Sequence, residues 1–547
     1  MNKFIIHALL IFSFLPPLFG QKKNKPAQFD QIDSLLQMYY APTQPGMAIS
    51  VIQHGQNVYT KQIGMANLEA GISITDSTAF HIASVSKQFT AFLALQLASE
   101  GQLSMDDDVR KYVPELSDLP LKISLRQLAN HTHGLPNLFE LAQLRGIGIA
   151  DRMSHREVVE MLLQINSINF SPGEAYQYNN TGYVLLAEVI ERVSGKAFHQ
   201  VLEEKLLAPI GMSRTFAVHD LAMLIPNRAH SYRRRGEGYQ NHAFHLMANG
   251  SSGLRTTIQD LARWAIYFQQ ATGTDQTIFE KMQQPSLLND GRELGYGLGL
   301  ERSTYKGLDV VFHGGGDAGY RAYILHVPAH GLSVVTLGNN NDFTPRTIAY
   351  QILDLFLADH QTPLLPPQKR RYTQADLETF TGTYEFCPGV YYQILAKHDS
   401  LFLHVLGGMG ELYLPTIGDG DFDYPLPDSK FSFDDEGMVF HIADFAYDCP
   451  KIELTPENND EDLSQYVGLY KNEALNTVYE LRIQDGQLVA SHAFNADIIL
   501  NPLAENVFFS PSGYFGRLDF KLKTDGGISG FDLSGRNLRA LLFRKIE

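Results

Sequence analysis

The chain has 547 residues, of which 44% are hydrophobic and 19% are charged, a composition typical of a globular protein too long for one hydrophobic core. Its formal net charge of −16 argues against nucleic acid and anionic membrane surfaces as partners. The two cysteines, Cys387 and Cys449, belong to no Cys/His cluster, so we expect no zinc site, and no motif indicates a cofactor.

Residues 1–20 have the pattern of a secretory signal peptide. Lys3 supplies a positive charge, residues 4–19 are mostly apolar, and Gly20 precedes polar Gln21. A membrane anchor is the alternative, but the apolar run is short and broken by prolines. We therefore expect a bacterial periplasmic or secreted protein that is not membrane-bound after cleavage.

The first informative motif follows a predicted helix at 29–40 and a predicted hairpin formed by 47–53 and 58–65. Ser84-x-x-Lys87 opens an apolar run with the spacing of a buried helix. Three residues make nearly one helical turn, so both side chains project from one face at the start of the helix. Serine is a weak nucleophile that needs a base, and a lysine whose pKa is lowered can serve as that base.

The second motif, Tyr178-Asn179-Asn180, lies between a Pro-Gly turn and a predicted helix at 183–193. The phenol of Tyr178 could exchange protons with the lysine and a leaving group, and Asn180 could bind a substrate carbonyl. His131 and His133 lie in a preceding loop. We favour a packing role for both over a catalytic one.

The third motif, His313-Gly314-Gly315-Gly316, follows strands predicted at 295–300 and 310–312. Two more strands are predicted at 320–327 and 332–337. Glycines in a strand often mark a close backbone approach, so a substrate could lie along this edge with the Gly316 N–H directed at its carbonyl oxygen.

These three motifs, in this order, resemble the serine β-lactamase and penicillin-binding DD-peptidase superfamily, most of all its class C branch. The resemblance extends over about residues 29–360. It implies an α+β catalytic domain at 21–361, with an antiparallel sheet flanked by helices, a helical lobe, and the active site between them.

The resemblance also implies an acyl-enzyme mechanism. Ser84 would attack a carbonyl, Lys87 and Tyr178 would share the base and acid roles, and Asn180 would orient the substrate. The N–H groups of Ser84 and Gly316 would form the oxyanion hole. Which of Lys87 and Tyr178 accepts the first proton stays open at this point.

His313 departs from the usual pattern, because penicillin-recognising members have lysine at this position. A neutral histidine is a weaker partner for a substrate carboxylate. The His-x-Gly version resembles D-aminopeptidases, esterases and other hydrolases of the branch. We therefore expect a serine hydrolase that acts on a small peptide, amide or ester, which could be derived from the cell wall. The alternative functions are a β-lactamase and a non-catalytic penicillin-binding-like sensor. As for the oligomeric state, a homodimer is left open.

Residues 362–373 form a Pro-rich linker, after which the chain repeats itself. The pattern Asp-Leu-x-x-aromatic-x-Gly-x-Tyr occurs at 376–384 and again at 462–470. Alternating apolar and polar residues between turns predict two small all-β, lipocalin-like barrel domains at 374–455 and 456–547. A catalytic domain followed by two such barrels resembles the layout of D-aminopeptidases.

Cys387 and Cys449 lie near the beginning and the end of the first repeat. Closing a barrel brings its first and last strands together, and a secreted protein meets oxidising conditions. We therefore expect a disulfide between them, with two buried thiols as the alternative.

Overall fold

The computed structural model describes residues 27–39, 41–362, 371–408, 410–418, 420–425, 429–434, 437–442, 445–453 and 462–546. The chain divides into two units, Met1–Tyr39 and Tyr40–Glu547. In the first unit, α1 (Ala27–Tyr39) confirms the helix predicted at 29–40. The predicted signal peptide and most of the predicted linker at 362–373 lie outside the described residues.

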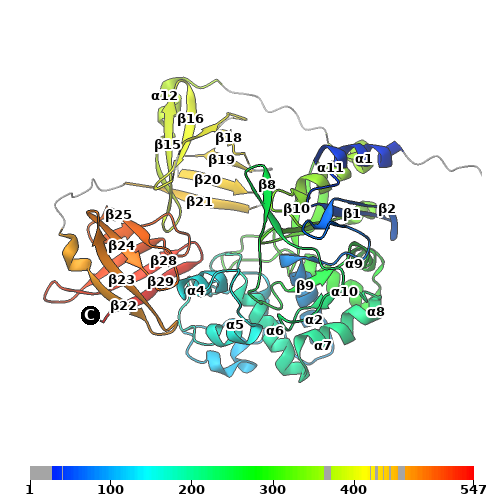
Figure 1. Cartoon of the computed structure of the whole chain (residues 1–547), viewed down its shortest axis with the longest axis horizontal. Helices are drawn as coiled ribbons and strands as arrows, with labels where there is room; N and C mark the ends of the chain where they lie inside the picture. Colours follow the sequence, from blue (N-terminus) through cyan, green and yellow to red (C-terminus); the bar gives the residue numbers. More distant parts are fainter. Residues whose placement is uncertain are drawn as a thin grey trace, which may run out of the picture. The chain divides into compact units, whose positions relative to one another are not determined.

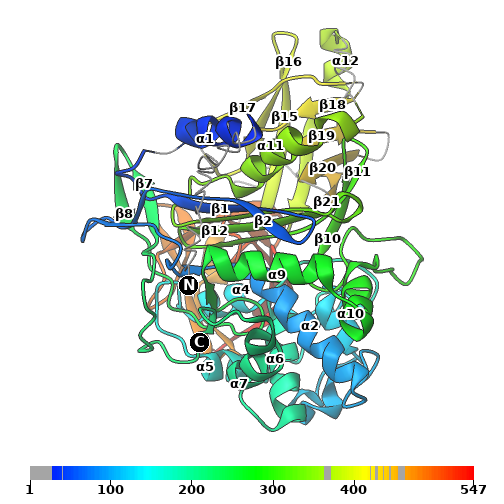
Figure 2. The same cartoon turned by 90° about the vertical axis from the view of Figure 1, so that its right-hand side faces the viewer.

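A six-stranded antiparallel sheet, in the order β10-β11-β12-β13-β1-β2, forms the centre of the catalytic domain. Its strands are β1 (Met47–Gln53), β2 (Gln56–Ile63), β10 (Glu301–Tyr305), β11 (Leu308–Asp317), β12 (Tyr320–Val327) and β13 (Leu332–Gly338). Helices α9 (Ile258–Gln270) and α11 (Pro345–Leu357) cover opposite faces of this sheet (Figure 2). Both faces are therefore buried, which explains why β13 is apolar along most of its length.

The helical lobe surrounds α2 (Ser86–Ser99), which is buried along most of its length and packs against α6 (Thr181–Ser194) and α10 (Gly273–Gln283). A helix that is apolar on all sides belongs in the interior of a lobe. The other helices are α3 (Leu125–Ala129), α4 (Leu138–Leu144), α5 (His155–Leu162), α7 (Phe198–Leu202) and α8 (Ala208–Ile210). Short strands complete the domain: β3 (Met65–Asn67), β4 (Ile72–Ser73), β5 (Phe80–His81), β6 (Phe216–Ala217), β7 (Tyr232–Arg235), β8 (Gly238–Asn241) and β9 (Leu254–Thr256).

The prediction of a strand at 295–300 is wrong. This segment is irregular and makes only the isolated bridge Tyr296–Glu301, so the edge strand begins at Glu301. Its glycines serve close packing instead. A Cβ atom on Gly297 would lie 2.1 Å from the carbonyl oxygen of Met282, and Gly299 has a φ of +74°.

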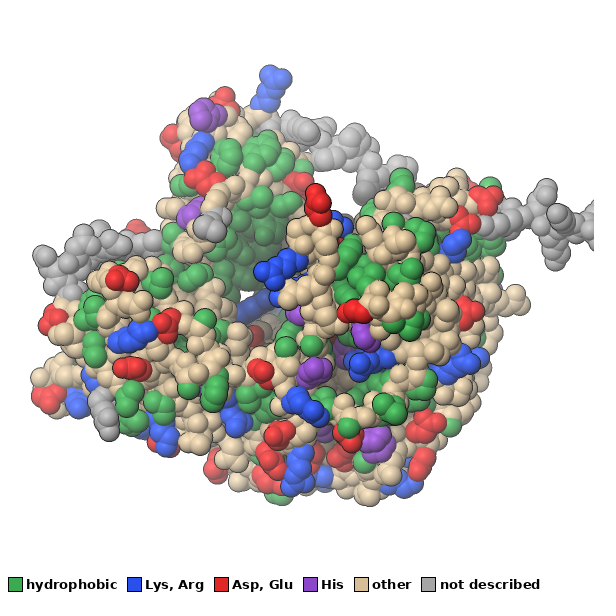
Figure 3. All heavy atoms as spheres, viewed as in Figure 1, with side chains coloured by type: hydrophobic (Ala, Val, Ile, Leu, Met, Phe, Trp, Pro, Cys, Tyr) green, Lys and Arg blue, Asp and Glu red, His purple; other side chains and the backbone are tan. Residues whose placement is uncertain are grey.

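Two all-β units follow α12 (Gln374–Glu378) (Figure 1). The first is an eight-stranded sheet in the order β17-β16-β15-β14-β21-β20-β19-β18, and the second, β22 to β29, is a closed barrel. Phe422, in the edge strand β18, forms an isolated bridge with Thr416, which lies shortly after the other edge strand, β17. Hydrophobic side chains gather over β18–β21 in the space-filling view (Figure 3). The α+β domain followed by all-β units confirms the predicted fold class.

The strands of the eight-stranded all-β sheet are β14 (Gly382–Cys387), β15 (Val390–Lys397), β16 (Ser400–Val405), β17 (Leu412–Leu414), β18 (Asp421–Asp423), β19 (Ser429–Phe433), β20 (Gly437–Ile442) and β21 (Phe445–Ile452). Those of the barrel are β22 (Gly468–Asn472), β23 (Thr477–Gln484), β24 (Gln487–Ser491), β25 (Ile498–Ala504), β26 (Val507–Phe509), β27 (Arg517–Leu522), β28 (Ile528–Gly535) and β29 (Leu538–Lys545). The sequence repeat has a structural basis. The hydroxyl of Tyr384 donates to the carbonyl of Phe380 at 2.8 Å, and that of Tyr470 donates to Tyr466 at the same distance.

The predicted disulfide is wrong, because Cys387 and Cys449 are both free and buried. The first and last strands of the sheet do pair, as Thr383 with Ile452. However, Cys449 belongs to the apolar core of the sheet, whereas Cys387 lines a cavity beside the catalytic domain. Burial raises the pKa of Cys387 to about 11 and that of Cys449 to about 12, so both thiols are protonated.

Within the described ranges, no helix combines the length and the apolarity needed to cross a membrane. The same residues contain no group of three or more His, Cys, Asp or Glu side chains arranged to hold a metal ion.

Candidate active site

Ser84 lies in a short 3-10 helix (Ala83–Val85) that leads into α2. The backbone before it is unusual, because Ala83 has a φ of +46°. Strand β11 comes very close here. A Cβ atom on Gly315 would lie 2.3 Å from the carbonyl oxygen of Ile82 and 3.1 Å from the Ser84 nitrogen. Glycine at this position therefore allows the strand to lie against the turn that presents the serine.

Lys87 is fully buried, and its Nζ makes three hydrogen bonds. It donates to the Ser84 Oγ at 3.0 Å, to the Asn180 Oδ1 at 2.8 Å and to the Ser251 carbonyl oxygen at 3.0 Å. Burial lowers the pKa of Lys87 to about 7, against a smaller opposing effect of Asp317. Near neutral pH a large fraction of this amine is uncharged and able to accept a proton.

Tyr178 lies beside Ser84. Burial raises the pKa of Tyr178 well above its ordinary value, so the phenol stays protonated. The ring of His131 packs against that of Tyr178, with centroids 4.3 Å apart. His131 and His133 are fully buried, and burial lowers the pKa of both, that of His133 to about 3. They are neutral packing residues, as favoured from the sequence.

Asn180 precedes α6 and is held by a residue that the sequence analysis missed. Its backbone N–H donates to the Oδ1 of Asn137 at 2.8 Å, while its own Oδ1 accepts from Lys87. Asn137 directly follows the His-Thr-His-Gly-Leu-Pro segment. This position next to a family segment could have identified Asn137 as a residue of the site. The Ser251 carbonyl was also missed, because a backbone acceptor leaves no mark in a sequence.

His313 is only 1% exposed, and both ring nitrogens have partners. Nδ1 lies 2.7 Å from the Gly314 carbonyl oxygen, which can only accept, so Nδ1 carries the proton. Nε2 then accepts from the Tyr296 hydroxyl at 3.1 Å. Burial lowers the pKa of His313 to about 3. The ring is therefore neutral and supplies no positive charge.

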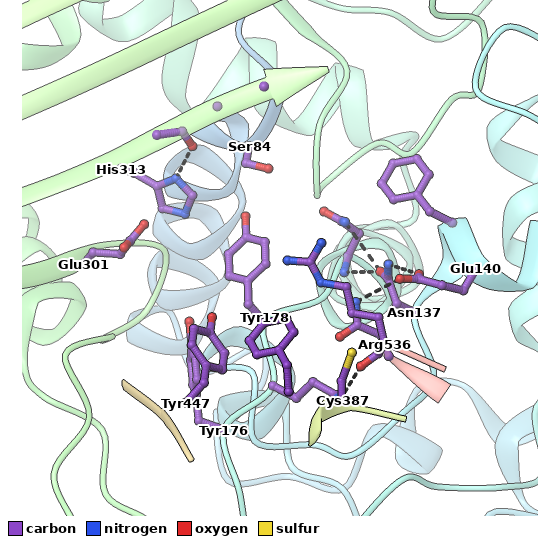
Figure 4. A pocket seen from close by; sticks show the side chains of 18 of the residues that line it. Ser84, Asn137, Glu140, Tyr176, Tyr178, Glu301, His313, Cys387, Tyr447 and Arg536 are labelled. Atoms are coloured by element: carbon purple, nitrogen blue, oxygen red, sulfur yellow. Dashed lines mark hydrogen bonds between the residues drawn. The ribbon is translucent and has the colours of Figure 1, made fainter. Parts of the chain in front are cut away.

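These side chains surround a cavity of about 640 Å³ (Figure 4). Of the six residues predicted from the sequence, Ser84, Tyr178, Asn180, His313 and Gly316 line it, and Lys87 lies behind Ser84. Gly316 pairs with Arg321, whose Nη1 donates to the carbonyl oxygens of Ala318 and Tyr320.

Residues 32–357 match the family model described as Beta-lactamase. The chain belongs to the β-lactamase family. The D-aminopeptidase of Gluconobacter oxydans (strain 621H) is 28% identical over 341 residues, which are 62% of this chain and 63% of that protein. The D-aminopeptidase of Brucella anthropi is 26% identical over 296 residues, 54% of this chain and 56% of that protein. The chain thus spans less than two thirds of the length of these curated relatives.

Solved structures share the fold of this β-lactamase family member. The octameric penicillin-binding protein homologue from Pyrococcus abyssi aligns with a TM-score of 0.56 and 24% identity, over 86% of this chain and 99% of that one. A class C β-lactamase aligns with a TM-score of 0.50 and 23% identity, over 60% of this chain and 94% of that one. The latter is a likeness of fold to the branch that the motifs resemble.

One wall of the cavity comes from outside the matched segment of this family member. It is formed by Phe386 and Cys387 of β14, Tyr447 of β21, Arg536 and Asn537 from the turn between β28 and β29, and Arg539 of β29. Sequence patterns describe individual elements and not how domains dock. No signal in the sequence could have assigned these residues to the active site.

Proposed function

We propose that the protein is a serine hydrolase that cleaves a peptide, amide or ester bond through an acyl-enzyme on Ser84. The observation that carries this proposal is the 3.0 Å contact between the Ser84 Oγ and the Nζ of Lys87, a buried amine with a pKa of about 7. A nucleophile paired with a base that is uncharged near neutral pH is what acyl transfer requires. The D-aminopeptidase relatives support amide substrates.

In the acylation step, Lys87 accepts the proton from the Ser84 hydroxyl as the oxygen forms a bond to the substrate carbonyl carbon. Lys87 is a better candidate for the first base than Tyr178, because burial lowers the pKa of the amine but raises that of the phenol. When the bond to the leaving group breaks, Tyr178 gives its proton to the departing nitrogen or oxygen and regains one from Lys87.

The backbone N–H groups of Ser84 and Gly316 are proposed to stabilise the oxyanion, and the close approach of Gly315 to the Ser84 backbone supports this. One such donor typically contributes about 3 kcal/mol to transition-state stabilisation. In deacylation a water molecule gives a proton to Lys87 as its oxygen forms a bond to the acyl carbon. The bond from that carbon to the Ser84 oxygen then breaks, and the Ser84 oxygen takes the proton from Lys87, which releases the acid product and restores the free enzyme.

Residues 1–20 support a periplasmic or secreted location. A fusion of this segment to a reporter enzyme that is active only after export would test the location separately from the activity.

The test of the hydrolase is covalent labelling of Ser84 by a fluorophosphonate, read by mass spectrometry, together with turnover of p-nitrophenyl esters and D-alanine p-nitroanilide. Ser84→Ala should abolish labelling and lower turnover by several orders of magnitude while the circular dichroism spectrum is unchanged. Undiminished turnover in Ser84→Ala would overturn the proposal. An unreactive Ser84 would instead favour a binding protein.

A further inference from the structure

The turn between β28 and β29 is fixed against the catalytic domain by its own backbone. The Asn537 carbonyl oxygen accepts from the Asn137 N–H at 3.3 Å and from the Asn169 Nδ2 at 3.0 Å. The Arg536 carbonyl oxygen accepts from the Gln177 Nε2 at 3.4 Å. These contacts fix the main chain from which the Arg536 side chain extends, and that side chain lines the cavity.

The guanidinium group of Arg536 points into the cavity (Figure 4). Among the described residues it makes no hydrogen bond or ion pair, and the side chain is exposed to the cavity. Arg539 differs, because its Nη1 donates to the carbonyl oxygens of Gly535 at 2.6 Å and Leu538 at 2.9 Å. Arg539 thus stabilises the turn, whereas Arg536 presents an unengaged positive charge.

The neighbouring acid does not neutralise this charge through a direct contact. Glu140 accepts hydrogen bonds from two amides, Asn537 at 2.9 Å and Asn137. Burial raises the pKa of Glu140, which favours its uncharged form. The other acid of the cavity, Glu301, lies beside His313 on the opposite side of Tyr178 (Figure 4).

We propose that Arg536 binds a carboxylate of the substrate, so that the enzyme acts on small acyl compounds with a free acidic group. This inference rests on the proposed hydrolase function of the same cavity. A guanidinium that has no partner among the residues the structure describes is suited to bidentate binding of a carboxylate. Tyr176, Phe386 and Tyr447 provide apolar surface for the chain that links the carboxylate to the scissile bond. The same positive charge disfavours substrates with a free ammonium group at this wall.

Binding can be separated from chemistry in the Ser84→Ala protein. The probes are D-alanine amides N-acylated with succinate, glutarate or adipate, each compared with its methyl ester, which lacks the negative charge. Calorimetry should show at least one acid binding ten- to hundredfold more tightly than its ester, the usual value of a charged hydrogen bond. In Ser84→Ala/Arg536→Gln this advantage should disappear. A matched control, Arg544→Gln, removes a charge from β29 outside the cavity and should leave the advantage intact.

Equal binding of acids and esters at all three lengths, or an advantage that survives Arg536→Gln, would overturn the inference. Fluorophosphonate labelling of Ser84 in the wild-type protein reports on the hydrolase itself. Preferential binding of an acid without labelling would retain the carboxylate site and reject the hydrolase. Labelling with no preference for acids would retain the hydrolase and reject the site.

Discussion

At the scale of single residues, Lys87 determines how the proposed reaction depends on pH. The amine must be uncharged to accept a proton, and burial lowers its pKa to about 7. We expect kcat/KM for a neutral p-nitrophenyl ester to rise tenfold per pH unit below about pH 7 and to level off above it. A pH-rate profile measured from pH 5 to 9 checks this.

The nearby imidazoles do not account for such a titration. Burial lowers the pKa of His133 and His313 to about 3 and that of His131 well below its ordinary value. Replacement of His133 by Asn should therefore leave the inflection near pH 7, even if the rate falls. An inflection that disappears with His133 would show that the base has been assigned wrongly.

The buried amine should also reduce stability. Between pH 7 and about 10.5 the unfolded chain holds the Lys87 proton and the folded protein does not, so stability rises with pH across this window. Lys87→Met removes both the burial penalty and this slope. Urea unfolding should show an inactive variant that is more stable by a few kcal/mol at pH 6.5, with an advantage that shrinks by about 1.4 kcal/mol per unit toward pH 9.5. An advantage that does not change with pH would contradict the assigned pKa.

The neutral ring of His313 determines how well we expect the protein to hydrolyse β-lactams. A β-lactam carries a carboxylate close to its scissile amide, and the resemblance places the lysine that binds it at position 313. The ring is neutral, and the nearby Arg321 donates to backbone carbonyl oxygens. We expect kcat/KM for a chromogenic cephalosporin to fall below that for a p-nitrophenyl ester by ten- to hundredfold or more. A clear preference for the cephalosporin would restore the β-lactamase alternative.

At the scale of elements, the site depends on how closely β11 approaches the turn before α2. Gly315→Ala would place a methyl group 2.3 Å from a backbone oxygen of that turn, which cannot move aside like a side chain. We expect the strand to shift and kcat/KM to fall by about a hundredfold, because small misplacements in an active site are costly.

Gly314→Ala is the matched control for this prediction. Its Cβ would meet only the side chain of Tyr323, at 3.3 Å, and the effect should be several-fold smaller. Equal losses in the two variants would indicate that the close approach at Gly315 is not what positions the site.

At the scale of the whole molecule, hydrophobic packing predicts how the unit Tyr40–Glu547, which contains the catalytic domain and both all-β parts, unfolds. The catalytic domain and the closed barrel share one buried apolar cluster, whereas the first β-sheet has its own. We expect calorimetry to resolve two transitions. Phe431→Ala, in the core of the first sheet, should lower one of them, and Phe531→Ala, in the barrel, should lower the other, each by about 3–5 kcal/mol of stability. A single transition that shifts in both variants would contradict this division.

Sequence patterns were most informative where a motif carries its own geometry. The Ser84 and Tyr178 motifs, the apolar α2 and the repeated Tyr384 and Tyr470 all appear in the structure as expected. Two other predictions failed for physical reasons. Glycines at 295–300 serve close packing and not a strand, and the two cysteines lie in different environments although their strands pair. Burial sets the pKa of Lys87, and the packing of the two all-β parts against the catalytic domain forms one wall of the cavity. Neither can be read from local sequence.

The turn that carries Arg536 has a consequence for the order in which the protein is made. A ribosome completes Ser84, Lys87 and Tyr178 early and reaches Arg536 only after both β units have been synthesised. Domains tend to fold in that order, so the nascent chain can assemble its nucleophile while this side of the cavity is still open to water. Selectivity is then acquired last. A chain cut short after the catalytic domain would lack Arg536, and it would also expose the part of the shared apolar cluster that the barrel covers.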